Sequence, residues 1–264
     1  MNSKVGIVLP TLGQRPEYLD QSLNSIANAV NEDNPPFVVL VAPSNFDASK
    51  YLAEGKINLT IQDNGLGLAD AINSGFSSMP SQIEYMNWLG DDDLLSPGSL
   101  SITSSYLDKN PRSVLVFGSC DYIDGDGNVV WKNSSGPHAV PLLRFGPDLI
   151  PQPGALFRKN AFWEVGGLDT KYAWAFDFDL LIKLSKIGKL SYLANTLSSF
   201  RWHPASLSVE HRRKSVTEAS AVRVTHLPPI LRLISGLWEF PVREATLIAG
   251  NRVTSIAKKK AKLD

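Results

Sequence analysis

The sequence predicts an α/β protein in which helices flank a mostly parallel β-sheet, followed by a helical C-terminal extension. Short apolar runs alternate with stretches of helical periodicity through the first hundred residues. This alternation is typical of a parallel sheet that is covered by helices on both faces. Beyond residue 208 the pattern is helical, with one break at Pro228 and Pro229.

Strands and helices alternate over the first ninety residues. The strands are runs of apolar residues, whereas the helices repeat apolar residues every three or four positions. Ligands of such sheets bind beyond the carboxyl ends of the strands, so we expect a site among the polar segments that follow them. We predict strands at 4–10, 37–43, 57–61 and 83–90, and helices at 17–30 and 67–79.

The second half predicts a different order of elements. Residues 113–124 and 127–133 flank an Asp-Gly-Asp-Gly sequence, which is typical of a β-hairpin. Pro97 suits the first turn of a helix that precedes this hairpin. We also predict a strand at 154–159, helices at 160–169 and 176–188, and an apolar face on the last helix formed by Leu180, Leu181, Leu184 and Ile187.

The hairpin turn, "DYIDGDGN" at residues 121–128, has the composition of a calcium-binding loop. In the twelve-residue calcium loop a glycine is required at the sixth position. Placing Gly127 there puts Tyr122 at the first ligand position and Asn133 where a bidentate Glu is needed. The sequence therefore argues against a calcium loop.

Charge is balanced over the whole chain but uneven along it. The 264 residues include 26 Lys and Arg and 26 Asp and Glu, which gives no indication of a nucleic-acid partner. From Leu207 onward there are eleven Lys and Arg against five Asp and Glu. We therefore expect an acidic main domain at 1–206 and a basic helical extension at 207–264.

The sequence indicates a cytoplasmic location. Cys120 is the only cysteine, so no internal disulfide can form. The chain enters a strand pattern at once, without the charged leader and apolar core of a signal peptide. Four charged residues interrupt the longest apolar stretch, 229–250, which therefore does not predict a membrane span.

Asp91, Asp92 and Asp93 follow the predicted strand at 83–90 directly. Adjacent carboxylates repel one another, so a solvated turn or a bound cation must offset the repulsion. In a solvated turn, one of them would cap the helix near Pro97. In a cation site, one or two carboxylates would hold Mg²⁺ or Mn²⁺ while a substrate diphosphate supplies further oxygens. The position at the ligand-binding edge of the sheet favours the cation.

Five segments, in order along the chain, resemble the signatures of family 2 glycosyltransferases, inverting enzymes with the GT-A fold that build bacterial surface polysaccharides. They cover most of residues 4–208. The resemblance implies that 1–93 binds a nucleotide sugar and that 94–206 binds the acceptor. The segments are "VGIVLPTLGQRPEYLDQSLNSI", "DNGLGLADAINSGF", "WLGDDDLLSPGSL", "VGGLDTKYAWAFDFDLLIKLSKIGKLSYL" and "FRWHPASLS".

The resemblance also implies a set of residues that bind the donor, either beside the nucleotide or around the nucleoside and ribose. Many family members have an aspartate after the second strand that reads the base, whereas this chain has Pro43 at that position. Either Asp63 alone or Asn45 would take its place. The residues implied for donor binding are Pro10, Thr11, Gly13, Asp63, Gly65, Asp70, Asp91 and Asp92.

A metal site and a catalytic base are implied by the same resemblance. Asp93 would ligate the metal directly and Asp91 would contact it through water or bind the ribose, with the register open by one residue. His203 would lie near the diphosphate or the metal. Asp177, with Asp179 close behind it, matches the base, and the alternative is that these two residues cap the predicted helix.

We therefore expect a glycosyltransferase that moves a sugar from a nucleotide-diphosphate sugar to a glycan or lipid-linked acceptor with inversion, using Mg²⁺ or Mn²⁺. A nucleotidyltransferase and a non-catalytic nucleotide-sugar-binding or scaffolding protein are the alternatives. The basic extension predicts peripheral contact with the inner face of the membrane. Packing of the same helices on the main domain is the alternative to that contact.

Overall fold

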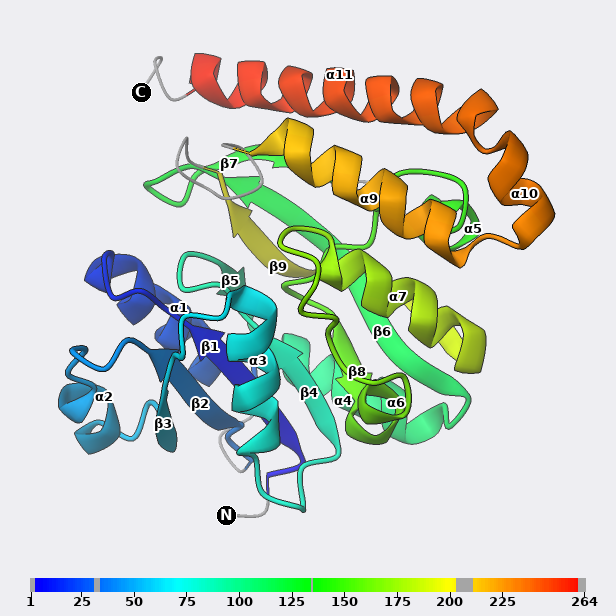
Figure 1. The fold of residues 1–264 in the computed structure, drawn as a ribbon. Coiled ribbons are helices and arrows are strands. Elements are labelled where there is room, and N and C mark those ends of the chain that lie inside the picture. The colour runs from blue at the N-terminus through cyan, green and yellow to red at the C-terminus, as the bar shows by residue number, and fades with distance from the viewer. Residues whose placement is uncertain (1–2, 31–33, 134, 203–210, 261–264) are drawn as a thin grey trace.

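A central sheet passes through the part of the chain that the computed structural model describes, residues 3–30, 34–133, 135–202 and 211–260 (Figure 1). It has nine strands in the order β3-β2-β1-β4-β8-β6-β9-β5, with β7 paired to β6. The strands are β1 Val5–Pro10, β2 Phe37–Ala42, β3 Leu59–Gln62, β4 Tyr85–Trp88, β5 Leu94–Leu95, β6 Ser113–Ile123, β7 Val129–Lys132, β8 Leu156–Arg158 and β9 Lys189–Arg201.

Helices of the main body and three C-terminal helices surround this sheet. The body helices are α1 Pro16–Asn28, α2 Ser49–Ala53, α3 Leu68–Ser77, α4 Ser99–Lys109, α5 Gly136–Leu142, α6 Lys159–Glu164 and α7 Phe176–Ile187. The C-terminal helices are α9 Arg212–His226, α10 Pro229–Ile234 and α11 Gly236–Lys260.

The first four long strands are parallel, as the alternating pattern predicts. β1 pairs in parallel with β2 and β4, and β2 pairs in parallel with β3. The second half makes the sheet mixed, because β8 runs antiparallel to both β4 and β6 while β9 runs parallel to β6. The predicted hairpin is confirmed by the antiparallel pair β6 and β7.

Alternate residues along the strands are buried on opposite faces of the sheet. On one face, Val8 and Met86 pack with α3, α6 and α7. On the other, Ile7 and Tyr85 pack with α1, α2 and α4. Both faces are therefore covered, which leaves the carboxyl-terminal edge of the parallel strands as the place for a ligand.

One local prediction is wrong, and the capping alternative for the triplet does not hold. Leu180, Leu181 and Leu184 are buried on α7, but Ile187 is 41% exposed, because it lies in the last turn of the helix. The helix after Pro97 begins at Ser99 with Gly98 at its N-cap and has no side-chain cap, so no aspartate of the triplet caps it.

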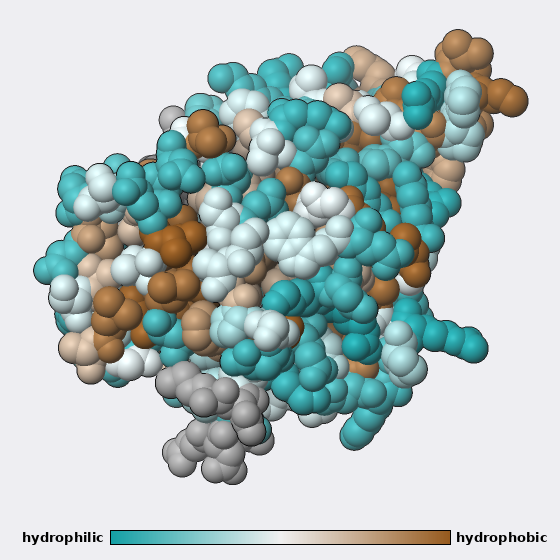
Figure 2. Space-filling model, turned by 60° about the horizontal axis from the view of Figure 1, so that its bottom comes forward, coloured by the Kyte–Doolittle hydropathy of each residue, from teal (hydrophilic) through white to brown (hydrophobic). Residues whose placement is uncertain are grey.

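The C-terminal helices pack against the main body through α9, which lies on α7, and through α11, which contacts β7. Helix α9 contacts α7 and α11 (Figure 1). Beyond it, α10 and the start of α11 expose large apolar side chains, and Figure 2 shows apolar side chains projecting at the upper right, on the side where Figure 1 places α10. Among the described helices, none combines the length and the apolarity needed to cross a bilayer.

Candidate active site

The ends of the parallel strands bring three predicted site segments to one edge of the sheet. Pro10 is the last residue of β1, and the amide of Thr11 continues the ladder by donating to the carbonyl of Val41 at 2.9 Å. The amide of Asp63 donates to the carbonyl of Ala42 at 2.8 Å. The amide of Leu89, at the end of β4, donates to the carbonyl of Val8 at 2.9 Å, just before the triplet begins.

Thr11 and Gly13 form a turn that holds the first aspartate. The Thr11 hydroxyl donates to Asp91 Oδ2 and accepts the Gly13 amide at 2.9 Å. Gly13 has φ +70°, and a Cβ at this position would lie 2.5 Å from the Phe46 ring. Only glycine fits this left-handed, crowded position without strain, so the turn after β1 is fixed next to Asp91.

Asp92 and Asp93 have different surroundings. Asp92 forms an ion pair with Arg15 at 3.2 Å in a partly exposed position. Asp93 is only 6% exposed, and its Oδ1 accepts the Arg201 amide at 2.9 Å. Burial, followed by the charges of Asp92 and Asp91, raises the pKa of Asp93 well above its usual value, although the Arg201 amide and charge act against the rise.

Arg201, the last residue of β9, is fully buried behind the triplet. Its guanidinium donates to the carbonyl oxygens of Asp92 at 2.9 Å and Asp124 at 3.0 Å. It also donates to the carbonyl of Gly125 at 2.8 Å and to Gln21 Oε1 at 2.6 Å. These bonds tie the triplet loop to α1 and to the hairpin turn, so Arg201 fixes the backbone that presents the carboxylates.

The remaining residues predicted for donor binding follow β3 or lie at the start of α3. The Asp63 carboxylate accepts the amide of Gly65 at 2.9 Å, and Gly65 has φ +69°. Asp70 lies in the first turn of α3 and is partly buried. Asn45, which is predicted as an alternative to the aspartate that reads the nucleotide base, is exposed in the turn after β2.

Asp177 lies on a different element, at the start of α7, and has a second carboxylate as its neighbour. Its Oδ1 accepts the Phe178 amide at 2.8 Å, and the cap position is Ala175, which caps through no side chain. Burial raises the pKa of Asp177 to about 6, and Glu218 adds to the rise. Burial and the charge of Asp177 raise the pKa of Asp148 well above its usual value.

The loop that carries Asp148 also reaches the triplet strand. Gln152 donates to the carbonyl of Trp88 at 2.7 Å and to Asn87 Oδ1 at 3.0 Å. Asn87 is fully buried and donates in turn to the carbonyl of Pro153 at 2.7 Å. The segment 148–153 therefore connects the carboxyl end of β4 with the surroundings of Asp177.

The Asp179 carboxylate joins α7 to α9 and does not cap a helix. It is 1% exposed, and its carboxylate contacts His226 Nε2 at 2.7 Å and Lys183 Nζ at 2.6 Å. Burial opposes ionisation, but the bonds from His226 and Lys183 hold the pKa of Asp179 below its usual value. His203, predicted near the diphosphate or metal, lies outside the described residues.

The triplet has the donor chemistry that Mg²⁺ or Mn²⁺ prefers, because its side chains supply only carboxylate oxygens. Over the ranges that the structure describes, no group of three or more His, Cys, Asp or Glu is arranged to enclose a metal ion. One or two carboxylates with substrate phosphates would be the usual Mg²⁺ arrangement, so the residues fit a metal that a diphosphate helps to hold.

A family model described as "Glycosyl transferase family 2" matches residues 6–166, well over half of the chain. The chain belongs to glycosyl transferase family 2. An uncharacterized glycosyltransferase of Rickettsia conorii is 25% identical over 265 residues, which cover 94% of this chain and 42% of that protein. Chondroitin synthase of Pasteurella multocida is 23% identical over 138 residues, 52% of this chain and 14% of the synthase. The chain thus spans less than half the length of either relative.

Solved structures of GT-A glycosyltransferases share the fold of this chain. S. aureus TarS 1–349 in complex with UDP-GlcNAc has a TM-score of 0.63 at 15% identity, covering 87% of this chain and 69% of that one. Mannosyltransferase PcManGT from Pyrobaculum calidifontis, in complex with GDP-Man and Mn²⁺, has a TM-score of 0.62 at 15% identity, covering 98% and 80%. At such identities the likeness shows the fold alone.

Arg201 and Gln152 donate to the backbone of the triplet and of the strand before it, and Asp148 interacts electrostatically with Asp177, but none of the three is among the predicted site residues. Asp148 is a single aspartate in a loop, and Gln152 is a single amide four residues later, so neither has a local signal. Arg201 lies within one of the resembling segments, but only its tertiary position reveals the four polar groups that its side chain contacts.

Proposed function

We propose that this family 2 protein transfers a sugar from a nucleotide-diphosphate sugar to a glycan or lipid-linked acceptor, with inversion at the anomeric carbon. The observation that supports this most is that one loop links two acidic centres: Gln152 in segment 148–153 donates to the carbonyl of Trp88 just before the triplet, and Asp148 in the same segment interacts electrostatically with Asp177. A single displacement at the anomeric carbon requires a group that stabilises the charge on the leaving diphosphate and a base that accepts the proton of the acceptor hydroxyl. The complexes of TarS with UDP-GlcNAc and of PcManGT with GDP-Man support the donor class.

In this proposal 1–93 binds the donor and 94–206 binds the acceptor. Asp177, whose pKa of about 6 leaves it mainly ionised at neutral pH, accepts the proton of the acceptor hydroxyl. The hydroxyl oxygen forms a bond to the anomeric carbon as the bond to the diphosphate oxygen breaks. The electron pair of that bond leaves with the nucleoside diphosphate.

Asp93 and Asp91 would hold Mg²⁺ or Mn²⁺, with His203 as a further candidate near the diphosphate. When bound, the metal supplies positive charge to the leaving diphosphate. The Thr11–Gly13 turn and Pro10 lie against the nucleotide, and Asp92 is kept in place by Arg15. Asp63, Gly65 and Asp70 line the part of the site that binds the nucleoside.

The first experiment measures nucleoside diphosphate release from UDP-, GDP- and dTDP-sugars, with and without crude lipid-linked acceptor. We expect one donor to react, only with Mg²⁺ or Mn²⁺ present, and Asp93→Ala to lower the rate by about 10²-fold or more because a charge-stabilising group is lost. Asp126→Ala, an exposed aspartate of the hairpin turn, is the control. Failure of every donor to bind or react would contradict the proposal.

We also propose that α10 and the start of α11 contact a membrane surface peripherally, which would hold the protein at the cytoplasmic face. Leu233 is 87% exposed and Leu237 is 78% exposed, with Ile230 and Phe240 exposed nearby. The Arg243 guanidinium lies 5.6 Å from the centre of the Phe240 ring. Exposed apolar side chains beside basic groups are typical of helices that lie on anionic bilayers.

Co-sedimentation with phosphatidylcholine vesicles, with and without anionic phosphatidylglycerol, tests this contact. We expect binding that increases with anionic lipid and is lost in the double variant Leu233→Glu/Leu237→Glu, because two charges would have to enter the interface. Leu52→Glu on α2 is the control, since this exposed leucine lies on a helix at the other end of the molecule (Figure 1). Equal binding of the double variant and the wild type would contradict the proposal.

A further inference from the structure

The segment before α7 is held by a carboxylate from the C-terminal extension. Glu218 Oε2 accepts the amides of Trp174 and Ala175, each at 2.7 Å. Its other oxygen, Oε1, accepts the amide of Ala173 at 3.1 Å. Three successive backbone donors therefore converge on one side chain, which comes from a helix 43 to 45 residues further along the chain.

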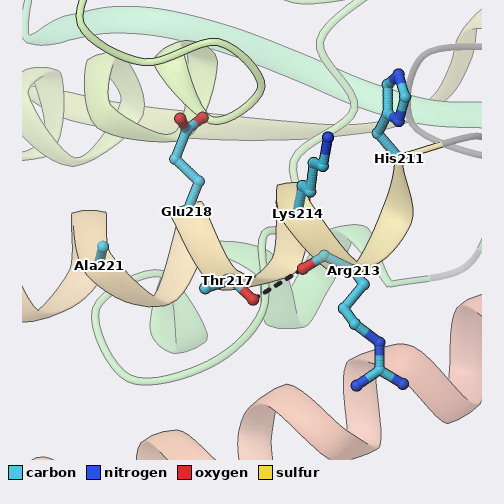
Figure 3. Close-up of a pocket in the computed structure, with 6 residues that line it drawn as sticks. All are labelled: His211, Arg213, Lys214, Thr217, Glu218 and Ala221. Carbon is cyan, nitrogen blue, oxygen red and sulfur yellow. Dashed lines mark hydrogen bonds between the residues drawn. The ribbon is translucent and has the colours of Figure 1, made fainter.

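The side chain of Glu218 lies where the chain turns into α7. Ala175 is the N-cap residue of α7, and Asp177 is in the first turn. A carboxylate at a helix N-terminus satisfies donors that the helix leaves unpaired and interacts favourably with the helix dipole. Figure 3 shows Glu218 pointing from α9 toward the neighbouring loop, in the same general direction as Lys214 and His211, whereas Arg213 points the opposite way, toward α11.

The same helix also holds the segment that carries Asp148. Arg223 donates to the carbonyl of Gly146 at 3.0 Å and pairs with Glu239 at 2.7 Å. Arg223 is 2% exposed, so this pairing is part of the packed interior. One helix thus contacts the backbone on both sides of the carboxylate pair, through Glu218 beside Asp177 and through Arg223 beside Asp148.

We propose that Glu218 is a positioning residue through which α9 fixes segment 173–175 and, with it, the Asp177 carboxylate at the start of α7. This inference rests on the proposed role of Asp177 as base. The C-terminal extension would then be needed for the transfer step itself, beyond any contact with a membrane.

Glu218 also acts on Asp177 through charge. Two carboxylates interact electrostatically with Asp177, namely Asp148 from the loop and Glu218 from α9, and the positive charge of Arg223 acts on Asp148. The Glu218 charge contributes to the raised pKa of Asp177. Removing that charge should therefore lower the pKa of Asp177 and move the acid limb of activity to lower pH.

The test compares Glu218→Gln and Glu218→Asp with the control Glu244→Gln. Glu244 lies on the same extension, and its exposed pairing with Arg243 at 3.7 Å should contribute little. For Glu218→Gln we expect kcat to fall by up to about 100-fold with the donor KM unchanged, because a small displacement of a catalytic group is sufficient for such a loss. The acid limb should move down by up to about one pH unit. Glu218→Asp keeps the charge, so its acid limb should stay close to that of the wild type while kcat falls.

Hydrogen exchange gives a readout that does not depend on turnover. We expect faster exchange in Glu218→Gln confined to the amides of residues 173–178, with the control unchanged. Unchanged exchange there, or a uniform increase over the whole chain, would overturn the inference. If no donor reacts, the proposed function fails, and the exchange rates together with a ¹³C titration of the Asp177 carboxyl still decide the role of Glu218.

Discussion

Asp177→Asn should lower kcat by about 10²- to 10⁴-fold while leaving donor affinity unchanged. The amide has almost the same shape as the carboxylate but cannot accept the proton of the acceptor hydroxyl, and general-base catalysis contributes on this scale. Donor binding should persist, because Asp177 lies on α7 and the proposed donor residues lie at the ends of β1, β3 and β4. Steady-state release of nucleoside diphosphate and calorimetric binding of the donor measure the two effects.

The pH dependence gives the same residue a second signature. With a pKa of about 6, Asp177 is ionised above that pH and protonated below it, so the wild-type rate should fall about tenfold per pH unit below 6. The Asp177→Asn variant should not show this fall in rate below pH 6. Asp126→Asn in the exposed hairpin turn should retain both the rate and the limb.

The folding stability of Asp177→Asn distinguishes loss of the catalytic base from loss of the folded structure. Because the folded state raises the pKa of Asp177, it favours the protonated form, and the stability that this residue contributes is greatest at low pH and decreases as pH rises through 6. A neutral Asn avoids this cost, so the variant should be at least as stable as the wild type at pH 7. Full activity in the Asn variant, or an acid limb that remains, would contradict the assignment.

Local patterns in the sequence were sufficient for the parallel half of the fold. β1 to β4, α1 and α3 coincide with apolar runs and helical periodicities, and both signals depend only on neighbours along the chain. The hairpin of β6 and β7 follows from its turn residues for the same reason. The edge of the sheet that carries Thr11, Asp63 and Asp91 could therefore be predicted.

The second half contains features that only tertiary contacts reveal. The 13-residue strand β9, "KLSYLANTLSSFR", has no counterpart among the predicted elements, since polar residues interrupt its apolar pattern. It pairs with β6 over most of its length, and that pairing places Arg201 behind the triplet. Glu218 likewise meets segment 173–175 only because α9 folds back on α7.

Arg201→Met should destabilise the protein by about 3–5 kcal/mol, because each buried acceptor that is left without its donor costs about 1–3 kcal/mol. Methionine replaces the unbranched stem of the arginine side chain, but it leaves the buried carbonyl oxygens of Asp92, Asp124 and Gly125 without their donors. Arg201→Lys should recover only part of the loss, because an ammonium group cannot reproduce the planar set of donors. The midpoint and slope of urea unfolding measure the change.

The control for Arg201 is Arg213→Met on α9, where the side chain is exposed, and a change within about 0.5 kcal/mol is expected there. The same Arg201 substitution should weaken donor binding, because the Asp92 carbonyl loses its guanidinium donor and the Asp93 carboxylate keeps only the backbone amide of residue 201. An unfolding free energy close to the wild type would show that water or neighbouring groups satisfy these carbonyls. In that case the triplet loop would owe its position to the Thr11 and Arg15 contacts instead.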